Sequence, residues 1–453
     1  MKKFCLMCSL SLIVSYSEAQ EKIRNAATVL INDPLFRHAQ FSFIVLDAKT
    51  GKEVYAVNKE LGLAAASTQK VFTAIAAFDL LGPTFRFTTS FSITDDAQKT
   101  LVVAASGDPT FGSNRWAFTN ETSILDKIRK GLGSAEIEPS TLTNIAFINP
   151  GYSLAQVPEG WIWQDIGNYY GAASQFFNWR ENQFDILFNT GASVGDSVSV
   201  SGITPSYLKS FHFDVSELKT AARGSGDKGY VFFDVWNKNG FMVNGTLPAG
   251  AQNFSLSAAH PDPERYFVDM LSSNGFGNIR TQPLQNRTNG KPIYQHQSPA
   301  LDSIMYWFLQ KSINLYGEAL IQRIALNQAG AASTHQGVNA LLNYWESKGI
   351  DKGSLHILDG SGLSPLNRVS SKALVSALMY ASQQKWFPAF YKALPLINGQ
   401  HMKSGFIEGA RSYAGYQHSK DGKDYVFAVI VNNYDGQSSS VTRKLWNLLD
   451  TLK

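Results

Sequence analysis

The hydrophobic and polar positions near the N-terminus follow two periodicities. Apolar residues recur at helical spacing over residues 22–40, whereas residues 41–47 and 53–58 alternate as strands do. A mostly apolar run, 71–81, then ends at Gly82-Pro83, a common helix stop. We therefore expect a helix, a β-hairpin and a buried helix in this region.

The rest of the chain changes character twice. Residues 84–295 contain short alternating stretches separated by Gly, Asn and Ser, which predicts mostly strands. Beyond residue 298, helical periodicity returns and two strand-like runs precede a last helix. The predicted helices are 301–309, 315–325, 338–348, 371–382 and 441–452, and the predicted strands are 409–417 and 425–432.

This order predicts an α/β protein with a discontinuous main domain. Residues 20–83 and 296–453 would form that domain, and residues 84–295 would form a β-rich insert of two subdomains. A chain of 453 residues is about three times the usual domain length, which agrees with several folding units.

The first residues indicate export. Two lysines after Met1, an apolar run over 4–14 and the small-x-small site Ser17-Glu18-Ala19 are typical of a signal peptide covering residues 1–19. Both cysteines, Cys5 and Cys8, lie within it, so the mature chain would lack disulfides and thiol chemistry. A lipoprotein site at Cys8 would leave a very short apolar stretch before it. No other apolar run reaches the length of a membrane span, so we expect a soluble, periplasmic protein.

The net charge and the spacing of the histidines indicate which kinds of partner the protein is not expected to bind. A net charge of +4 is too dilute over this chain for a phosphate-binding surface, so no nucleic acid partner is expected. The eight histidines show no metal-ligand spacing, and we expect neither a metal nor a cofactor.

Five Ser-x-x-Lys sequences begin at Ser67, Ser206, Ser216, Ser225 and Ser382. On the first turn of a helix, residues three apart share a face, so the lysine amine can take the serine proton. Only Ser67-x-x-Lys70 follows an alanine run and leads directly into an apolar helix, where burial would lower the pKa of a lysine. We therefore select Ser67 and Lys70.

Two other short motifs, Lys-Ser/Thr-Gly and Ser-x-Asn, carry groups that could bind a substrate. Lys-Ser/Thr-Gly occurs as Lys49-Thr50-Gly51, which a hairpin turn explains, and as Lys403-Ser404-Gly405, which precedes a strand-like run. An edge strand at the second triplet could present a cation, a hydroxyl and backbone donors to an anion. Ser312-Ile313-Asn314 adds a hydroxyl and an amide near a helix start.

The order of these motifs resembles that of the serine penicillin-recognising enzymes. More than half of the chain separates Ser67 from Ser312, a spacing similar to that of the penicillin-binding protein 4 family (S13) of D-alanyl-D-alanine carboxypeptidases and endopeptidases. Further stretches between residues 25 and 435 also resemble this family: Ser106-Gly107-Asp108-Pro109-Thr110, Trp161-Ile162-Trp163-Gln164-Asp165, Asp359-Gly360-Ser361-Gly362-Leu363-Ser364 and Ala414-Gly415-Tyr416. The resemblance implies a catalytic domain with a five-stranded antiparallel sheet flanked by helices.

The resemblance also implies a reaction, hydrolysis of the terminal D-Ala-D-Ala bond of peptidoglycan stem peptides. Ser67 would be the nucleophile and Lys70 its base. Ser312 and Lys403 would pass a proton to the leaving amine, and Asn314 would orient the peptide. β-Lactams would acylate Ser67 for the same reasons.

Substrate recognition is implied at four further positions. Ser404 would bind the terminal carboxylate beside Gly405, and the backbone N–H groups of Ser67 and Phe406 would form an oxyanion hole. Asp165 resembles an aspartate of the insert that meets the free amine of diaminopimelate. Ser404 replaces the threonine usual in the family.

Three alternatives remain open from the sequence. The enzyme could also cleave cross-links as an endopeptidase, or the same scaffold could serve a β-lactamase or esterase. A non-catalytic peptidoglycan-binding protein is the rival from another class. The oligomeric state is not predicted.

Overall fold

The computed structural model describes residues 20–95, 99–154, 157–208, 211–237, 240–283 and 290–453. The expected signal peptide, residues 1–19, lies outside this described part. The chain forms two compact units, which comprise residues 1–83, 305–313 and 337–453 in the first unit, and residues 84–304 and 314–336 in the second. The domain limits expected from the sequence, residues 20–83 with 296–453 and residues 84–295, remain a prediction.

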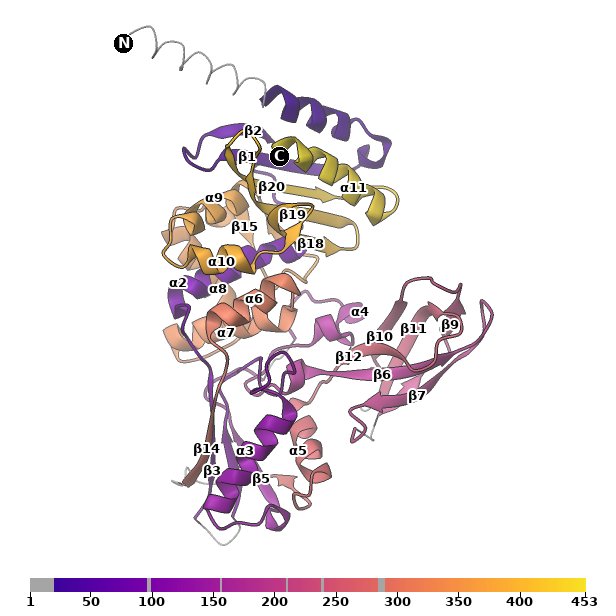
Figure 1. Ribbon diagram of the computed structural model, residues 1–453, viewed down its shortest axis with the longest axis vertical. Helices are drawn as coiled ribbons and strands as arrows, with labels where there is room; N and C mark the ends of the chain where they lie inside the picture. The colour runs from indigo at the N-terminus through magenta and orange to yellow at the C-terminus, as the bar shows by residue number, and fades with distance from the viewer. Residues whose placement is uncertain (1–19, 96–98, 155–156, 209–210, 238–239, 284–289) are drawn as a thin grey trace. The chain divides into compact units, whose positions relative to one another are not determined.

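The first unit is built on an antiparallel sheet with the strand order β17-β18-β19-β20-β1-β2 (Figure 1). The strands are β1 (Gln40–Asp47), β2 (Glu53–Val57), β17 (Leu396–Ile397), β18 (Gln400–Ile407), β19 (Ala410–His418) and β20 (Asp424–Asn432). β1 pairs with β20 along its whole length, from Gln40 opposite Asn432 to Asp47 opposite Tyr425. The expected five-stranded sheet is confirmed, and β17 adds a short strand at its edge.

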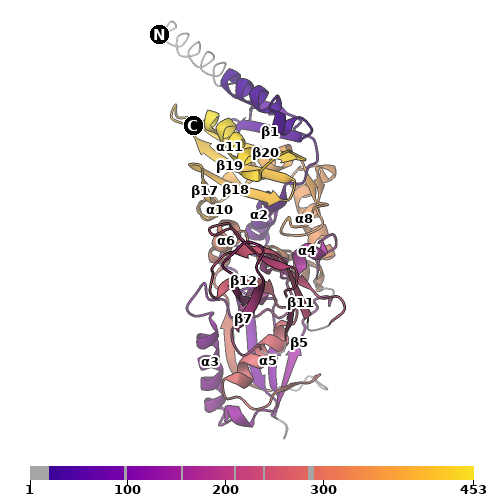
Figure 2. The same cartoon turned by 90° about the vertical axis from the view of Figure 1, so that its right-hand side faces the viewer.

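Helices cover both faces of this sheet. Residues 20–31 and α11 (Ser438–Leu449) lie along one face (Figures 1 and 2). The apolar side chains shared there include Ile23, Leu30, Phe43, Phe427, Val429 and Leu445. Because side chains alternate along a strand, Ser42 points to the other face, where its hydroxyl lies 2.6 Å from that of Ser371 at the start of α9 (Ser371–Ser382). α2 (Lys70–Leu81) packs against α9.

The remaining helices named in the text are α3 (Glu121–Ser134), α4 (Trp163–Ile166), α5 (Pro263–Ser273), α6 (Leu301–Gln310), α7 (Asn314–Ala329), α8 (Thr334–Ser347) and α10 (Phe387–Ala393). The helices expected from periodicity at 71–81, 301–309, 315–325, 338–348 and 371–382 are all present. The Lys49-Thr50-Gly51 triplet forms the β1–β2 turn, in which Asp47 Oδ1 accepts hydrogen bonds from the backbone N–H groups of Lys49 and Thr50.

The described residues of the second unit form three sheets. Their strand orders are β13-β5-β4-β3-β14, β12-β6-β7 and β10-β11-β8, with β9 also pairing with β11. The strands are β3 (Thr88–Ile93), β4 (Leu101–Ala104), β5 (Asn144–Ile148), β6 (Gln183–Thr190), β7 (Val198–Thr204), β8 (His212–Asp214), β9 (Leu218–Ala221), β10 (Lys228–Phe233), β11 (Gly240–Pro248), β12 (Phe254–Ala259), β13 (Arg280–Thr281) and β14 (Lys291–Gln297).

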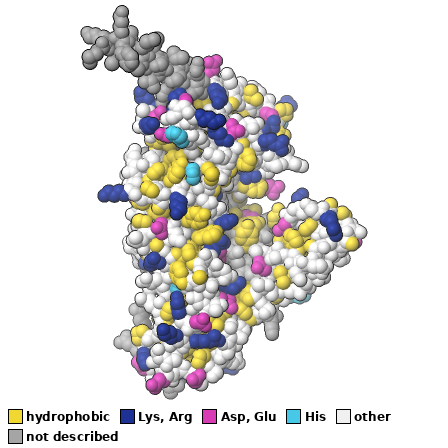
Figure 3. All heavy atoms as spheres, viewed as in Figure 1, with side chains coloured by type: hydrophobic (Ala, Val, Ile, Leu, Met, Phe, Trp, Pro, Cys, Tyr) yellow, Lys and Arg dark blue, Asp and Glu magenta, His cyan; other side chains and the backbone are white. Residues whose placement is uncertain are grey.

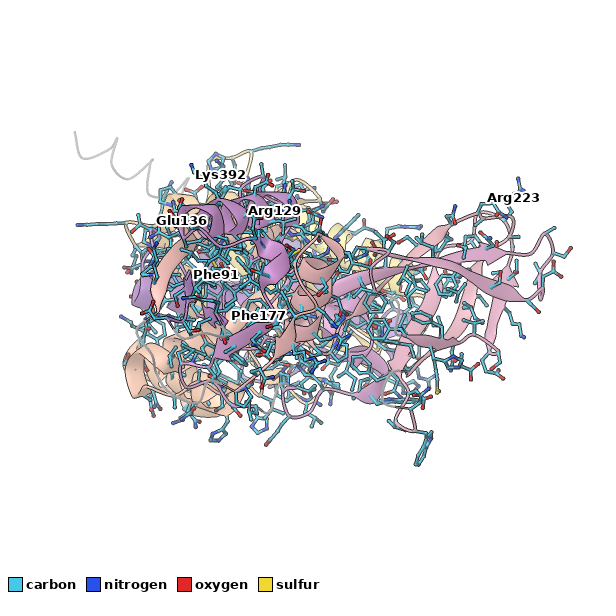
Figure 4. All side chains as sticks on the ribbon, turned by 90° about the horizontal axis from the view of Figure 1, so that it is seen from below. Phe91, Arg129, Glu136, Phe177, Arg223 and Lys392 are labelled. Atoms are coloured by element: carbon cyan, nitrogen blue, oxygen red, sulfur yellow. The ribbon has the colours of Figure 1, made fainter. Side chains whose placement is uncertain are left out.

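An aromatic core joins the five-stranded sheet to its helices. Phe111 contacts Phe91 of β3 at 6.0 Å and Phe177 at 5.8 Å between ring centroids, and Phe267 of α5 contacts all three rings. Phe91 and Phe177 lie inside the unit, whereas Arg223 projects from the turn after β9 (Figure 4). The middle region is thus rich in strands, as expected, but it also contains α3 and α5.

Among the described residues, no helix combines the length and the apolar character that a bilayer span requires. Basic and acidic side chains are interspersed over the face shown in Figure 3.

Candidate active site

Ser67 lies in a strained turn at the start of α2. The 3-10 turn η2 (Ala66–Gln69) runs directly into this helix. Ala66 has φ +47°, a conformation that costs free energy for a residue with a Cβ atom. Gly362 packs against this turn, and a Cβ atom at Gly362 would lie 2.2 Å from the Ala66 carbonyl oxygen. Strain that neighbours maintain in this way is common at functional sites.

Lys70 points from the first turn of α2 toward Ser67. Its side chain is fully buried, and Nζ donates hydrogen bonds to Ser67 Oγ at 2.9 Å and to the Ser361 carbonyl at 2.6 Å. The Phe308 ring centroid of α6 lies 5.9 Å from Nζ. The arrangement supplies a buried amine in contact with a half-buried hydroxyl, which is what nucleophile activation requires.

The other Ser-x-x-Lys sequences lie in different surroundings. Their described lysines, Lys219, Lys228 and Lys385, are exposed. Lys219 donates to the backbone carbonyl of Ser216, and the Ser382 hydroxyl donates to the Met379 carbonyl. The lysine after Ser206, Lys209, lies outside the described residues.

Lys403 lies on β18 and is also buried. Its Nζ donates a hydrogen bond to the Ser404 carbonyl at 2.7 Å. Burial holds the pKa of Lys403 well below its usual value, and a positive charge on Lys70 would lower it further. Two lysines therefore share one buried region of the first unit, where two full charges would be costly.

Gly405 brings the edge of β18 against the Ser67 turn. A Cβ atom at Gly405 would lie 2.2 Å from the Ala65 carbonyl oxygen and 3.0 Å from the Thr68 backbone nitrogen. Ser412 of β19 reinforces this contact, because its hydroxyl donates to the Ala65 carbonyl at 2.5 Å and lies 3.0 Å from Thr68 Oγ1. Phe406, next on β18, is exposed beside Gly405.

Two of the sequence-selected residues belong to the second unit. Asn314 begins α7, and its side-chain amide donates to the Tyr170 carbonyl at 2.8 Å. The Tyr170 hydroxyl in turn hydrogen bonds the Asp165 carboxylate, and burial raises the pKa of Asp165 to about 6. Ser312 belongs to the first unit and precedes α7 with φ +57°.

The structure thus assembles Ser67, Lys70, Lys403 and Gly405 in the first unit, and Asn314 with Asp165 in the second. It also reveals contacts that sequence reasoning did not assign. Ser361, Gly362 and Ser412 touch the Ser67 turn or Lys70 through a carbonyl, a missing Cβ and a hydroxyl. The glycine-rich stretch around Ser361 was a signal for the first two, whereas Ser412 lies two residues before the resembling stretch Ala414-Gly415-Tyr416 and is not part of it. Among the described residues, no group of three or more His, Cys, Asp or Glu side chains could hold a metal ion.

Comparison with known families shows to which family the chain belongs. The model of the D-Ala-D-Ala carboxypeptidase 3 (S13) family matches residues 23–451. The chain belongs to the S13 family. This S13 enzyme is similar to D-alanyl-D-alanine carboxypeptidase DacB of Haemophilus influenzae, with 23% identity over 96% of this chain and 94% of that protein. It is also similar to a D-alanyl-D-alanine carboxypeptidase of Actinomadura sp. strain R39, with 22% identity over 92% of this chain and 82% of that protein.

Solved structures show the same fold. Penicillin-binding protein 4 (dacB) of Haemophilus influenzae has a TM-score of 0.77 and 22% identity, over 91% of this chain and 96% of that chain. A structure of that protein complexed with a β-lactam has a TM-score of 0.73 and 19% identity, over 95% of this chain and 99% of that chain. The S13 chain is a serine-type D-Ala-D-Ala carboxypeptidase of the penicillin-binding protein group and acts on peptidoglycan, as the resemblance implied.

Proposed function

We propose that this carboxypeptidase works through an acyl-enzyme on Ser67, with Lys70 as the general base. The observation that carries the proposal is the 2.9 Å hydrogen bond between Lys70 Nζ and Ser67 Oγ inside a buried region. Burial disfavours a charged amine. In a neutral Lys70 the same contact can run in the other direction, with the Ser67 hydroxyl donating to the lone pair of Nζ. The exposed lysines of the other described Ser-x-x-Lys sequences lack that environment.

The steps of the proposed reaction use the residues selected from the sequence. Lys70 takes the hydroxyl proton as Ser67 Oγ attacks the penultimate D-Ala carbonyl carbon. The backbone N–H groups of Ser67 and Phe406 stabilise the oxyanion. The C–N bond breaks as the proton taken by Lys70 passes through Ser312 and Lys403 to the leaving D-Ala amine, and Lys403, whose pKa burial lowers, can accept that proton and pass it on. Water finally hydrolyses the ester at Ser67.

Substrate positioning uses the edge of β18 and α7. Ser404 binds the terminal carboxylate of the stem peptide, next to the close approach at Gly405, while Asn314 orients the peptide amide. The Asn314 amide already has one partner in the Tyr170 carbonyl, which fixes the direction of the side chain. A fixed amide loses less conformational entropy when substrate binds.

Asp165 gives this enzyme a preference for stem peptides that carry a free amine, as diaminopimelate does. Its carboxylate is half-buried, so a charge-assisted hydrogen bond there is stronger than at the surface. The same contact would help the enzyme cleave D-Ala-diaminopimelate cross-links as an endopeptidase. The enzyme would meet these substrates in the periplasm, after export directed by residues 1–19.

Labelling with a fluorescent penicillin tests the proposal. Ser67→Ala should abolish both labelling and D-Ala release, because the hydroxyl is the only proposed nucleophile and such losses amount to many orders of magnitude. Ser206→Ala, Ser216→Ala, Ser225→Ala and Ser382→Ala are matched controls that should label normally.

The time course of labelling separates the alternatives. Persistent labelling of the unmodified enzyme supports the peptidase, and rapid loss of label supports a β-lactamase. Labelling that survives in Ser67→Ala would transfer the nucleophile to another residue.

A further inference from the structure

Three consecutive backbone carbonyls of the Asp359–Ser364 turn accept hydrogen bonds from the end of η2 and the start of α2. The donors are all buried, and two of them flank the residue proposed as base. The pairs are Gln69 Nε2 with the Asp359 carbonyl at 2.8 Å, Lys70 Nζ with the Ser361 carbonyl at 2.6 Å and Thr73 Oγ1 with the Gly360 carbonyl at 2.7 Å. The turn therefore lies in fixed register with the start of α2.

The Asp359 carboxylate holds this turn in shape. It is fully buried, and it accepts hydrogen bonds from the backbone N–H of Gly362 at 2.6 Å and of Ser364 at 2.7 Å, one on each oxygen. The Asn367 side-chain amide adds a further bond at 3.2 Å. Both oxygens of a carboxylate accept hydrogen bonds, so Asp359 can bind two backbone N–H groups of the turn. An asparagine could bind only one of them, because its amide nitrogen donates and cannot accept.

The Ser361 carbonyl constrains how Lys70 can present its amine. A neutral amine has two N–H donors and one lone pair, and a carbonyl oxygen can only accept. The 2.6 Å contact therefore fixes an N–H toward Ser361, which sets the rotation of the amine about its Cε–Nζ bond. The direction of the lone pair relative to Ser67 Oγ depends on that rotation.

We propose that Asp359 is a positioning residue for acylation: by shaping the turn, it aims the Ser361 carbonyl at Lys70 and so directs the amine's lone pair to the Ser67 hydroxyl. Asp359 touches neither the nucleophile nor the substrate in this role. The proposal rests on the assignment of Lys70 as the base. Asp359 takes no part in the bond changes of the reaction, but it maintains the geometry of the base.

The test is single-turnover acylation by penicillin, measured across pH for the full chain and for Asp359→Asn. We expect the limiting acylation rate constant to fall by about 10- to 100-fold, because misplacing a catalytic group by about 1 Å can cost about 100-fold in rate. The non-covalent dissociation constant for penicillin should stay within about two-fold, because Asp359 does not contact the ligand.

The pH profile supplies a readout that a purely structural role would not move. A carbonyl acceptor stabilises an ammonium more than an amine, so its loss should shift the acidic limb of the acylation profile to lower pH. Lys403 of β18 interacts electrostatically with Lys70, and it is unchanged in the variant. Asp351→Asn is the matched control, because Asp351 also accepts a backbone N–H in a turn, at 2.9 Å from Gly353, but is exposed. It should acylate normally.

A second pair of variants decides the question if Asp359→Asn does not fold. Thr73→Val removes the bond to the Gly360 carbonyl, and Thr73→Ser keeps it. The valine variant should acylate more slowly with the same shift of the acidic limb, and the serine variant should recover most of the rate.

Two outcomes are distinguishable. The proposal is overturned if the folded variants contain a smaller fraction of active molecules but keep the acylation rate constant and the acidic limb of the unmodified enzyme. Lys70→Ala, measured in parallel, tests the assignment of Lys70 as the base. Normal acylation by that variant would show that Lys70 is not the base, and this conclusion does not depend on the result for Asp359.

Discussion

At the scale of single residues, position 405 requires glycine because there is no space for a Cβ atom, and not because the backbone there must be flexible. A Cβ atom there would approach the Ala65 carbonyl oxygen to 2.2 Å and the Ser412 hydroxyl to 2.4 Å. Backbone atoms cannot yield as a flexible side chain can, so Gly405→Ala must push β18 away from the Ser67 turn. We expect penicillin acylation to fall by at least about 100-fold, with a stability loss of about 1–3 kcal/mol, measured by labelling kinetics and urea unfolding.

Gly133 offers the matched control. It lies in α3, and a Cβ atom there would meet nothing within 4 Å. Gly133→Ala should therefore stabilise the protein by up to about 1 kcal/mol, the helix-propensity gain, and leave acylation unchanged. Equal acylation by both alanine variants would show that the strand edge does not need to approach the turn.

Asp165 should make substrate preference depend on pH. Burial raises the pKa of its carboxyl to about 6, so the carboxylate is charged at pH 7.5 and mostly protonated at pH 5. The substrate amine stays positive over this range. The ratio of kcat/KM for an amine-bearing stem peptide to that for its N-acetylated form should thus fall by about 10-fold from pH 7.5 to pH 5.

Asp165→Asn should give a low ratio at every pH. Because both peptides share the catalytic groups, the ratio cancels their titration. A ratio that is flat with pH in the unmodified enzyme would exclude Asp165 from recognition of the amine.

The residues that we propose act through side-chain chemistry could be selected from the sequence. Ser67 and Lys70 stood out because an apolar helix follows them, and Lys49 was set aside because a hairpin turn explained it. Ser361 and Asp359 were noticed as part of a resembling stretch but received no role. Their contacts to α2 run through backbone carbonyls, which every residue has, so no residue type marks them.

At the scale of elements, a buried glutamate ties three segments of the second unit together. Glu181 accepts hydrogen bonds from Arg115 Nε at 2.7 Å, from the Ser113 hydroxyl at 2.7 Å and from the Tyr316 hydroxyl of α7 at 2.7 Å. It lies in a turn in which Arg180, Glu181 and Asn182 all have φ between +52° and +57°. Glu181→Ala leaves a partly buried guanidinium without this partner, so we expect a loss of about 3–5 kcal/mol in unfolding free energy, measured by urea denaturation.

The exposed ion pair between Glu60 and Lys372 provides the comparison. Its atoms lie 2.7 Å apart, but both side chains are more than half exposed. Glu60→Ala should cost less than about 1 kcal/mol, because solvent screens such pairs. Similar small losses in both variants would mean that the Glu181 network does not hold the second unit together.

Periodicity predicted the long apolar elements well and the short capped ones poorly. The buried helix α2 and the strands β19 and β20 appear where the pattern placed them. α3 and α5 were overlooked in the strand-rich middle, although each has a start signal: Asn120 accepts from the Ser123 N–H, and Asp262 accepts from the Arg265 N–H. Caps of this kind are visible in a sequence, but glycines within α3 weakened its helical pattern.

At the scale of the whole molecule, the order of the motifs was more informative than any one of them. Ser-x-x-Lys occurs five times and Lys-Ser/Thr-Gly twice, so neither is specific alone. Their order and separation indicated the family, which the match over residues 23–451 establishes. The placement of Asn314 in the second unit could not be foreseen, because the boundary between units follows three-dimensional contacts rather than composition.

The pairing of β1 with β20 also bears on the order in which the first unit can assemble. Ser67 and Lys70 are synthesised early, yet β1 can pair only once residues 424–432 are present, and the contacts of the Ser67 turn require Gly405 and Ser412. Contacts between such distant segments form late, because the intervening chain must first be made and its ends brought together. A prematurely terminated chain therefore carries Ser67 without the surroundings that we propose activate it.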